Sequence, residues 1–139
     1  MDILLVAPGT GNSVGKMKIV PFPQASLPLL AALTPSGHKV KIIDERLENI
    51  NFDEKWDVVG ITVMTATASR AYYIADEFRK RGTKVVLGGI HPTALPDEAI
   101  KHADSIVIGE AEGLWEELIE DREKGELKKF YSHDCPPPL

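Results

Sequence analysis

The sequence has 139 residues, of which 43% are hydrophobic and 27% charged, and this fits one globular domain that can bury a core without cross-links. The formal net charge is −5 with acidic and basic residues interleaved, so we expect no nucleic-acid partner, and the longest apolar runs have the length of strands, so we expect no membrane span. The single cysteine, Cys135, excludes an internal disulfide and fits the reducing cytoplasm, where we expect this domain.

The first part of the chain alternates apolar runs with helical and polar segments. Residues 3–7 form a short apolar run that Pro8 and Gly9 end, which predicts a buried strand. A glycine-bearing loop follows from residue 8 to about residue 23. Residues 25–34 then have helical spacing, and residues 39–44 predict a second strand. A polar connection over residues 45–55 leads to the next apolar run.

The stretch 57–67 begins as a strand with almost no polar residue facing outward, which is typical of a strand covered on both faces of a parallel sheet. A helix over residues 69–81 follows, with apolar residues at helical spacing and a glycine after its end. The remaining sequence predicts a strand at 83–87, a short helix at 96–103, a strand at 105–108 and a last helix from residue 114.

Five apolar strands that alternate with helices predict an α/β fold with a doubly wound five-stranded parallel sheet, flavodoxin-like or Rossmann-like. We expect the strand order 2-1-3-4-5, which is common for sheets of this size. The domain is predicted to cover residues 1–122. Residues 123–139 are polar and end in three prolines before Leu139, so we interpret them as a linker toward a C-terminal domain that this chain lacks.

The glycine loop after the first strand does not fit a nucleotide site. A P-loop needs one more residue between Gly11 and Gly15, and Met17 stands where the hydroxyl for magnesium should be. A dinucleotide fingerprint needs a helix that begins at the glycines and an acidic residue about 20 positions further, whereas Asp44 lies 35 residues beyond Gly9. We favour a mobile lid for this loop. A phosphoacceptor site fails because no carboxylate cluster follows the strands.

Three strand exits carry unusual sequences: Thr62-Val63-Met64-Thr65, Gly88-Gly89-Ile90-His91-Pro92 and Gly109-Glu110-Ala111-Glu112-Gly113. In open α/β sheets, ligands bind at the carboxyl ends of such strands. The combination resembles the cobalamin-binding domain at the amino end of B12-dependent radical S-adenosylmethionine (SAM) enzymes, from Ile3 to about Ile119. In the wider family, a Ser-x-Leu element and a Gly-Gly pair flank the nucleotide tail of the cofactor, and residues 62–64 and 88–89 match them loosely.

The resemblance implies that this domain binds cobalamin through its strand exits, with no catalytic residue and no protein ligand to the metal. A histidine in such a turn, as His91 is, more often forms hydrogen bonds with backbone groups than it binds a metal. The acidic residues Glu110 and Glu112 could contact the cofactor, but the dipole of the following helix explains their position equally well. The family's Asp-x-His-x-x-Gly motif is absent, because Pro8-Gly9-Thr10-Gly11-Asn12 follows the first strand. The residues that would contact the cofactor are Thr62, Val63, Met64, Thr65, Thr67, Gly88, Gly89, His91, Pro92, Gly109 and Glu110.

The resemblance also implies a larger parent protein. This chain has no three-cysteine cluster motif, so a [4Fe-4S] cluster and SAM would bind only to a C-terminal radical SAM domain, which would be the partner of this one. The reaction would be a methyl transfer or an oxidative cyclisation. Two alternatives stay open: a docking or scaffold domain whose cofactor site has decayed, and a small enzyme that uses NAD or ATP.

Overall fold

The computed structural model describes residues 1–9 and 26–133. In this part of the chain, six strands form one parallel sheet in the order β2-β1-β3-β4-β5-β6. The α/β class and the order 2-1-3-4-5 are therefore confirmed, but the number of strands is six and not five. The strands are β1 (Asp2–Ala7), β2 (Lys39–Asp44), β3 (Val58–Thr62), β4 (Lys84–Gly88), β5 (Ser105–Val107) and β6 (Phe130–Tyr131).

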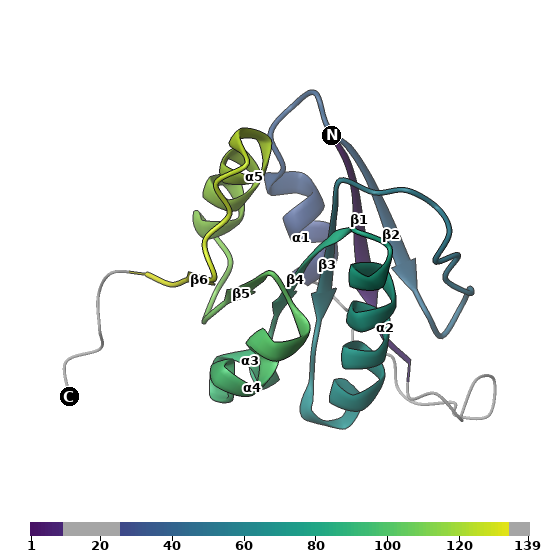
Figure 1. The fold of residues 1–139 in the computed structure, drawn as a ribbon. Helices are drawn as coiled ribbons and strands as arrows, with labels where there is room; N and C mark the ends of the chain where they lie inside the picture. Colours follow the sequence, from purple (N-terminus) through teal and green to yellow (C-terminus); the bar gives the residue numbers. More distant parts are fainter. Residues whose placement is uncertain (10–25, 134–139) are drawn as a thin grey trace, which may run out of the picture.

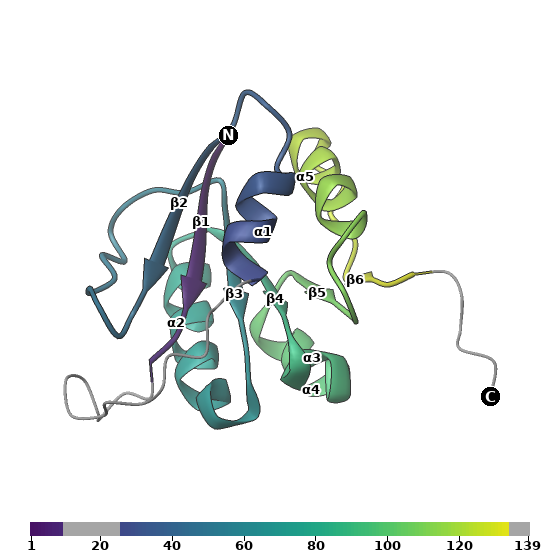
Figure 2. The same ribbon diagram turned by 180° about the vertical axis from the view of Figure 1, so that it is seen from behind.

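Helices cover both faces of the sheet. Helices α1 and α5 lie on one face, and α2, α3 and α4 lie on the other (Figure 1, Figure 2). The longest described helix has 13 residues, so no helix in the described ranges is long enough to cross a bilayer. The helical elements are α1 (Ser26–Leu33), η1 (Thr65–Thr67), α2 (Ala68–Lys80), α3 (Ile90–Ala94), α4 (Pro96–Ala99), η2 (Ile100–His102) and α5 (Leu114–Lys124).

Alternating side chains along each strand build two separate cores. On β1, Leu4 and Val6 pack toward α2, while Ile3 and Leu5 pack toward α1 and α5. The same alternation holds for β3, β4 and β5. Because both faces of the central strands are covered, β1 and β3 are almost entirely apolar, which is why the apolar runs located them correctly in the sequence.

The strand that the sequence analysis missed, β6, lies in the stretch interpreted as a linker. It pairs with β5, and the Tyr131 side chain is 2% exposed. The Tyr131 hydroxyl donates a hydrogen bond to Asp121 Oδ2 at 2.7 Å and accepts one from the Lys128 amide at 3.0 Å. A two-residue strand after a polar segment has too little periodicity to stand out in the sequence.

Two predictions fall outside the described residues. The first is the mobile lid, or nucleotide site, considered for the glycine loop, of which only Pro8 and Gly9 are described. The second concerns the proline-rich end of the chain, which includes Cys135. Pro8 and Gly9 themselves are buried at the end of β1.

Candidate functional site

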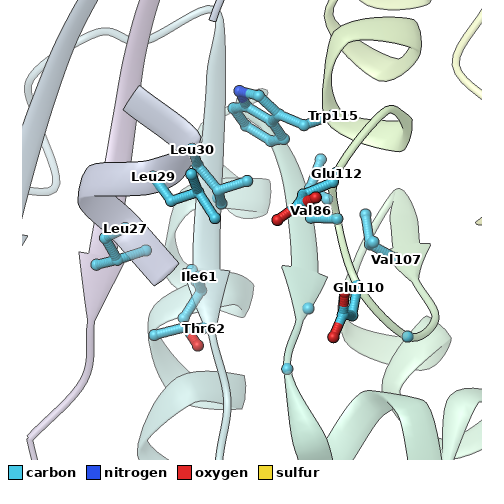
Figure 3. A pocket seen from close by; sticks show the side chains of 15 residues that line it. Leu27, Leu29, Leu30, Ile61, Thr62, Val86, Val107, Glu110, Glu112 and Trp115 are labelled. Carbon is cyan, nitrogen blue, oxygen red and sulfur yellow. The ribbon is translucent and has the colours of Figure 1, made fainter. Parts of the chain in front are cut away.

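A cavity of about 290 Å³ lies between α1 and α5 at the carboxyl ends of the central strands (Figure 3). Its exposed lining residues are Leu29 of α1 and Gly109, Glu110 and Glu112 after β5, so the cavity opens between these two segments. The lining consists of Leu27, Leu29 and Leu30 of α1, Gly60, Ile61 and Thr62 of β3, Val86, Gly88 and Gly89 at the end of β4, Val107, Gly109, Glu110, Ala111 and Glu112 around the end of β5, and Trp115 of α5.

Missing side chains on one face of the sheet create this cavity. Gly60 pairs with Val86, and Thr62 pairs with Gly88. Since side chains alternate along a strand, Gly60 and Thr62 face the same side, toward α1 and α5. Gly88 at the end of β4 has no side chain to fill the space under the helices. Gly60, in the middle of β3, lets Leu5 and Trp115 pack close to the strand at the inner end of the cavity.

Trp115 closes the inner end of the cavity. The side chain is 1% exposed, and a Cβ placed on Gly60 would lie 3.4 Å from its Cη2. The indole Nε1 donates a hydrogen bond to Thr34 Oγ1 at 2.9 Å, and that hydroxyl donates to the Leu30 carbonyl oxygen at 2.7 Å. In Figure 3 the ring lies at the end of the cavity away from Thr62. This pair of bonds holds α5 against α1 across the cavity.

The exits of β3 and β4 interlock through their backbones. The Val63 amide donates to the Gly88 carbonyl oxygen at 2.8 Å, and the His91 amide donates to the Val63 carbonyl oxygen at 3.1 Å. Gly89 has φ +109°, and a Cβ there would lie 2.8 Å from the Val63 carbonyl oxygen. Only glycine fits this position, because both its φ and its space exclude a side chain.

The structure divides the predicted contact residues into two groups. Thr62, Gly88, Gly89, Gly109 and Glu110 line the cavity. The others do not: Val63 is buried in the core toward α2, and Met64, Thr65, Thr67, His91 and Pro92 belong to η1, α3 and the turn before them. Strand alternation explains the position of Val63, because residues 62 and 63 point to opposite faces. The other residues that do not line the cavity lie beyond the ends of β3 and β4. Their contacts with a cofactor remain predictions.

His91 lies in a polar cluster next to α2. Its Nδ1 is 3.3 Å from Thr65 Oγ1 and its Nε2 is 2.8 Å from Glu98 Oε2. The Tyr72 hydroxyl donates to the same Glu98 oxygen at 2.7 Å. Hydrogen bonds from Tyr72 first, and then from His91, hold the pKa of Glu98 below its usual value. Both ring nitrogens of His91 thus have partners, which fits a residue that fixes the turn.

The remaining predicted residues have local roles or lie at the mouth. The Met64 amide lies 3.2 Å from Thr67 Oγ1, which closes the η1 turn. The Gly109 amide donates to Thr93 Oγ1 at 2.9 Å. Glu110 and Glu112 are exposed, and Thr62 is half-buried. Among the described residues, no group of three or more His, Cys, Asp or Glu side chains is arranged to hold a metal ion.

A buried ion pair at the ends of β1 and β2 was not foreseen. Glu45 is 8% exposed and accepts a hydrogen bond from the Gly9 amide at 2.9 Å. Arg70 of α2 donates through Nε at 3.0 Å and also through Nη2 to the same carboxylate. Burial acts to raise the pKa of Glu45, but the hydrogen bonds from Arg70 and Gly9 outweigh it, so the net pKa is lowered.

Most of the cavity wall was not predicted from the sequence. Leu27, Leu30 and Trp115 have the spacing of ordinary core residues, and nothing in the pattern distinguishes a core position from a wall. Gly60 was the available signal, because it lies two residues before Thr62 on an otherwise bulky strand.

Comparison with known proteins gives a consistent result. The family model described as "B12 binding domain" matches residues 21–119. The chain is 50% identical over 119 residues to the bacteriochlorophyllide d C-8(2)-methyltransferase of Chlorobaculum tepidum. The aligned region covers 84% of this chain and 26% of that protein.

Two further relatives are also named as methyltransferases. The bacteriochlorophyllide d C-12(1)-methyltransferase of Chlorobaculum tepidum is 39% identical, over 92% of this chain and 28% of that protein. An uncharacterised methyltransferase of Pyrococcus horikoshii is 34% identical, over 92% of this chain and 31% of that protein. The chain therefore spans between a quarter and a third of the length of these relatives.

Proposed function

Because the chain belongs to the B12-binding domain family, we propose that it binds cobalamin at the carboxyl edge of the sheet, with the nucleotide tail of the cofactor in the cavity between α1 and α5. The observation that carries this proposal is the glycine-lined hollow at the exits of β3 and β4. It lies where ligands bind in open α/β sheets.

The size and lining of the cavity fit this tail. A volume of about 290 Å³ is at the lower end of the range for ligand pockets, so the cavity has room for one part of a large ligand. A flat aromatic base suits the apolar inner walls of Leu27, Leu30 and Trp115. The much larger corrin ring would lie outside, over the edge of the sheet.

The residues of this chain would bind and orient the cofactor. The Thr62 hydroxyl at the mouth is placed to bond polar atoms of the tail. Gly88 and Gly109 have no side chain, and a Cβ on Gly109 would meet no atom within 4 Å, so the tail can approach the backbone there. When bound, cobalamin supplies the methyl-transfer chemistry, and the protein supplies the position and a site that excludes water.

For the whole protein we propose a cytoplasmic methyltransferase in which this domain works with a separate C-terminal domain that holds a [4Fe-4S] cluster and SAM. The names of the relatives support methyl transfer over oxidative cyclisation. The radical SAM part rests on the resemblance of the strand exits to B12-dependent radical SAM enzymes.

A decayed docking domain is the alternative from another class. It predicts a groove at the strand exits that is filled by the protein's own side chains. The cavity beside Thr62 and Gly88 does not fit that prediction, so we do not favour this alternative.

A titration of the chain with hydroxocobalamin tests the proposal. We expect the cobalt absorption bands to shift with saturation, and the corrinoid to stay with the protein during gel filtration. NAD and ATP should leave the melting temperature unchanged, since ligand binding to the native state alone would raise it. No spectral change and no retained corrinoid at high micromolar concentration would remove cofactor binding from the proposal.

A pair of variants ties the binding to the cavity. Leu30→Trp puts a bulky ring into the cavity and should weaken cobalamin binding at least tenfold. Leu47→Trp adds the same ring at a site that is 84% exposed, and we expect unchanged affinity. Circular dichroism checks that both variants fold. Equal affinities in the two variants would place the tail elsewhere.

A further inference from the structure

We propose that the cavity selects corrinoids by the base of their nucleotide tail, and that it accepts an apolar benzimidazole base but disfavours a purine such as adenine. The inference rests on the proposed function, since it concerns how the same cavity recognises the tail. Four observations on the lining support it.

The first observation is that aliphatic side chains form the two inner walls of the cavity. Leu27 and Leu30 form one wall, and Val86 and Val107 form the other (Figure 3). All four side chains are aliphatic, and Leu27, Val86 and Val107 are buried. A base between these walls therefore meets hydrocarbon on both of its faces.

The second observation concerns the indole of Trp115 at the inner end of the cavity. Its N–H is already donated to Thr34 Oγ1 at 2.9 Å. The nitrogen points away from the mouth of the cavity (Figure 3). The Thr34 hydroxyl is itself engaged, because it donates to the Leu30 carbonyl oxygen. The inner end thus presents an aromatic ring and no available donor.

The third observation is that the backbone amide and carbonyl groups of the strands beneath the cavity are hydrogen-bonded to neighbouring strands. Gly60 lies between β1 and β4 and pairs with residues of both, namely Leu5 and Val86. Val86 lies in turn between β3 and β5. Backbone groups in the middle of a sheet are bonded to the neighbouring strands, so they offer nothing to a base.

The fourth observation is the position of the polar lining residues. Thr62 and Glu110 lie at the mouth, and Glu112, which is exposed, lies beside Val86 in Figure 3. Gly60, under the indole, is two residues deeper than Thr62, or about 7 Å along the strand. Groups at the mouth can therefore bond the sugar and phosphate of the tail, but they lie far from the end of a base that reaches Trp115.

These features distinguish two bases of similar shape. The benzimidazole of cobalamin carries two methyl groups on its far edge, which suit the contact with the indole. Adenine carries an amino group and additional ring nitrogens, and these would lose their hydrogen bonds to water without replacement. An apolar pocket rejects a ligand that carries additional polar groups only moderately, by up to about 100-fold, so we expect at least a tenfold difference in affinity.

The experiment compares three corrinoids on the 139-residue chain, with binding followed by visible absorption and by calorimetry. The probes are cobalamin, the cobamide that has adenine as its base, and cobinamide, which lacks the nucleotide. We expect cobalamin to bind tightest. The adenine cobamide should bind at least tenfold more weakly, with an affinity close to that of cobinamide.

The outcomes separate this inference from the proposed function. If cobalamin and the adenine cobamide bind equally, and both bind better than cobinamide, base selection is wrong while cofactor binding stands. If cobinamide binds as tightly as cobalamin, the base does not enter the cavity and the inference is overturned. If no corrinoid binds, both proposals are overturned.

A matched pair of variants tests the physical cause. Leu30→Gln adds an amide to the inner wall and should narrow the difference between the two bases at least threefold. Leu30→Met keeps an apolar side chain of similar size and should preserve the difference. If the glutamine variant does not fold, as judged by circular dichroism, the comparison of the three corrinoids on the unaltered chain still decides the inference. An unchanged difference in a folded glutamine variant would contradict it.

Discussion

Gly89 connects the exit of β4 to α3 in a conformation that other residues avoid. Its φ is +109°, and an added Cβ would lie 2.8 Å from the Val63 carbonyl oxygen and 3.1 Å from the Val63 nitrogen. Both contacts are with backbone, which cannot rotate away. We predict that Gly89→Ala lowers the free energy of unfolding by roughly 2–4 kcal/mol, from backbone strain and overpacking together.

Gly109 provides the control for this prediction, because it separates strain from contact. Its φ is also positive, at +81°, but a Cβ there would have no atom within 4 Å. Gly109→Ala should therefore lower the free energy of unfolding only by about 1–2 kcal/mol, from conformation alone. Urea denaturation measures both variants. Equal losses would mean that the interlock between Val63 and Gly89 contributes nothing.

Single residues also show how far the site could be predicted from the sequence. Thr62, Gly88 and Gly89 were identified because hydroxyl and glycine residues at strand exits are unusual in an apolar chain. Met64, Thr65 and His91 stand beside them in sequence, but they lie beyond the strands, in η1, in α3 and in the turn before η1, and do not line the cavity. The alternation of side chains along β3 would have separated Thr62 from Val63 and added Gly60.

At the scale of elements, the pair of Glu45 and Arg70 joins the end of β2 to α2. The same carboxylate accepts the Gly9 amide just after β1. The folded-state pKa of Glu45 is lowered from a reference value of 4.5, since the bonds from Arg70 and Gly9 outweigh the effect of burial. Its contribution to stability is therefore complete above about pH 4.5 and is lost as the pH falls through the folded-state pKa.

We predict that Glu45→Gln flattens the acid side of the stability profile. In the unaltered chain, the free energy of unfolding should fall steadily below pH 4.5, with Asp44 and Glu98 contributing as well, since their pKa values are also lowered. In the variant, the slope should be smaller and the stability at pH 7 lower. Urea denaturation at several pH values measures this, with the exposed Glu54→Gln as the control. Parallel profiles for the two variants would contradict the assignment.

Among the elements, the sequence predicted those with strong patterns and missed those without. The central strands are buried on both faces and therefore appear as continuous apolar runs. Helix α3 and strand β6 are short, and β6 follows a polar segment. Tyr131 nevertheless packs into the core beside α5. Its place depends on the distant strand β5 and on the bond to Asp121, and neither is visible as local periodicity.

At the scale of the whole molecule, the sheet separates two different surroundings at its carboxyl edge. The face of α1 and α5 contains the cavity, with glycines beneath it and aliphatic walls. The face of α2, α3 and α4 carries the polar cluster of Tyr72, His91 and Glu98, where the side chains bond one another. The first face has room for part of a ligand, and the second fixes the turns that shape the edge.

This asymmetry predicts where cobalamin will change the dynamics of the domain. A ligand that fills the cavity should raise the opening free energy of the elements around it. We expect amide hydrogen exchange in α1 and in α5 to slow at least tenfold at saturating cobalamin. Exchange in the second half of α2, from Ile74 to Lys80, should stay within about twofold, because this segment lies on the opposite face of the sheet.

Hydrogen exchange read by mass spectrometry, with and without the cofactor, measures both regions in one experiment. Leu30→Trp serves as the control, since a filled cavity should abolish the slowing in α1 and α5 without altering α2. Slowing that is confined to α2 and α3 would instead assign the cofactor to the face of Thr65 and His91. In that case the hollow formed by Gly60 and Gly88 would be a packing feature of the fold, and the nucleotide tail would have to bind outside it.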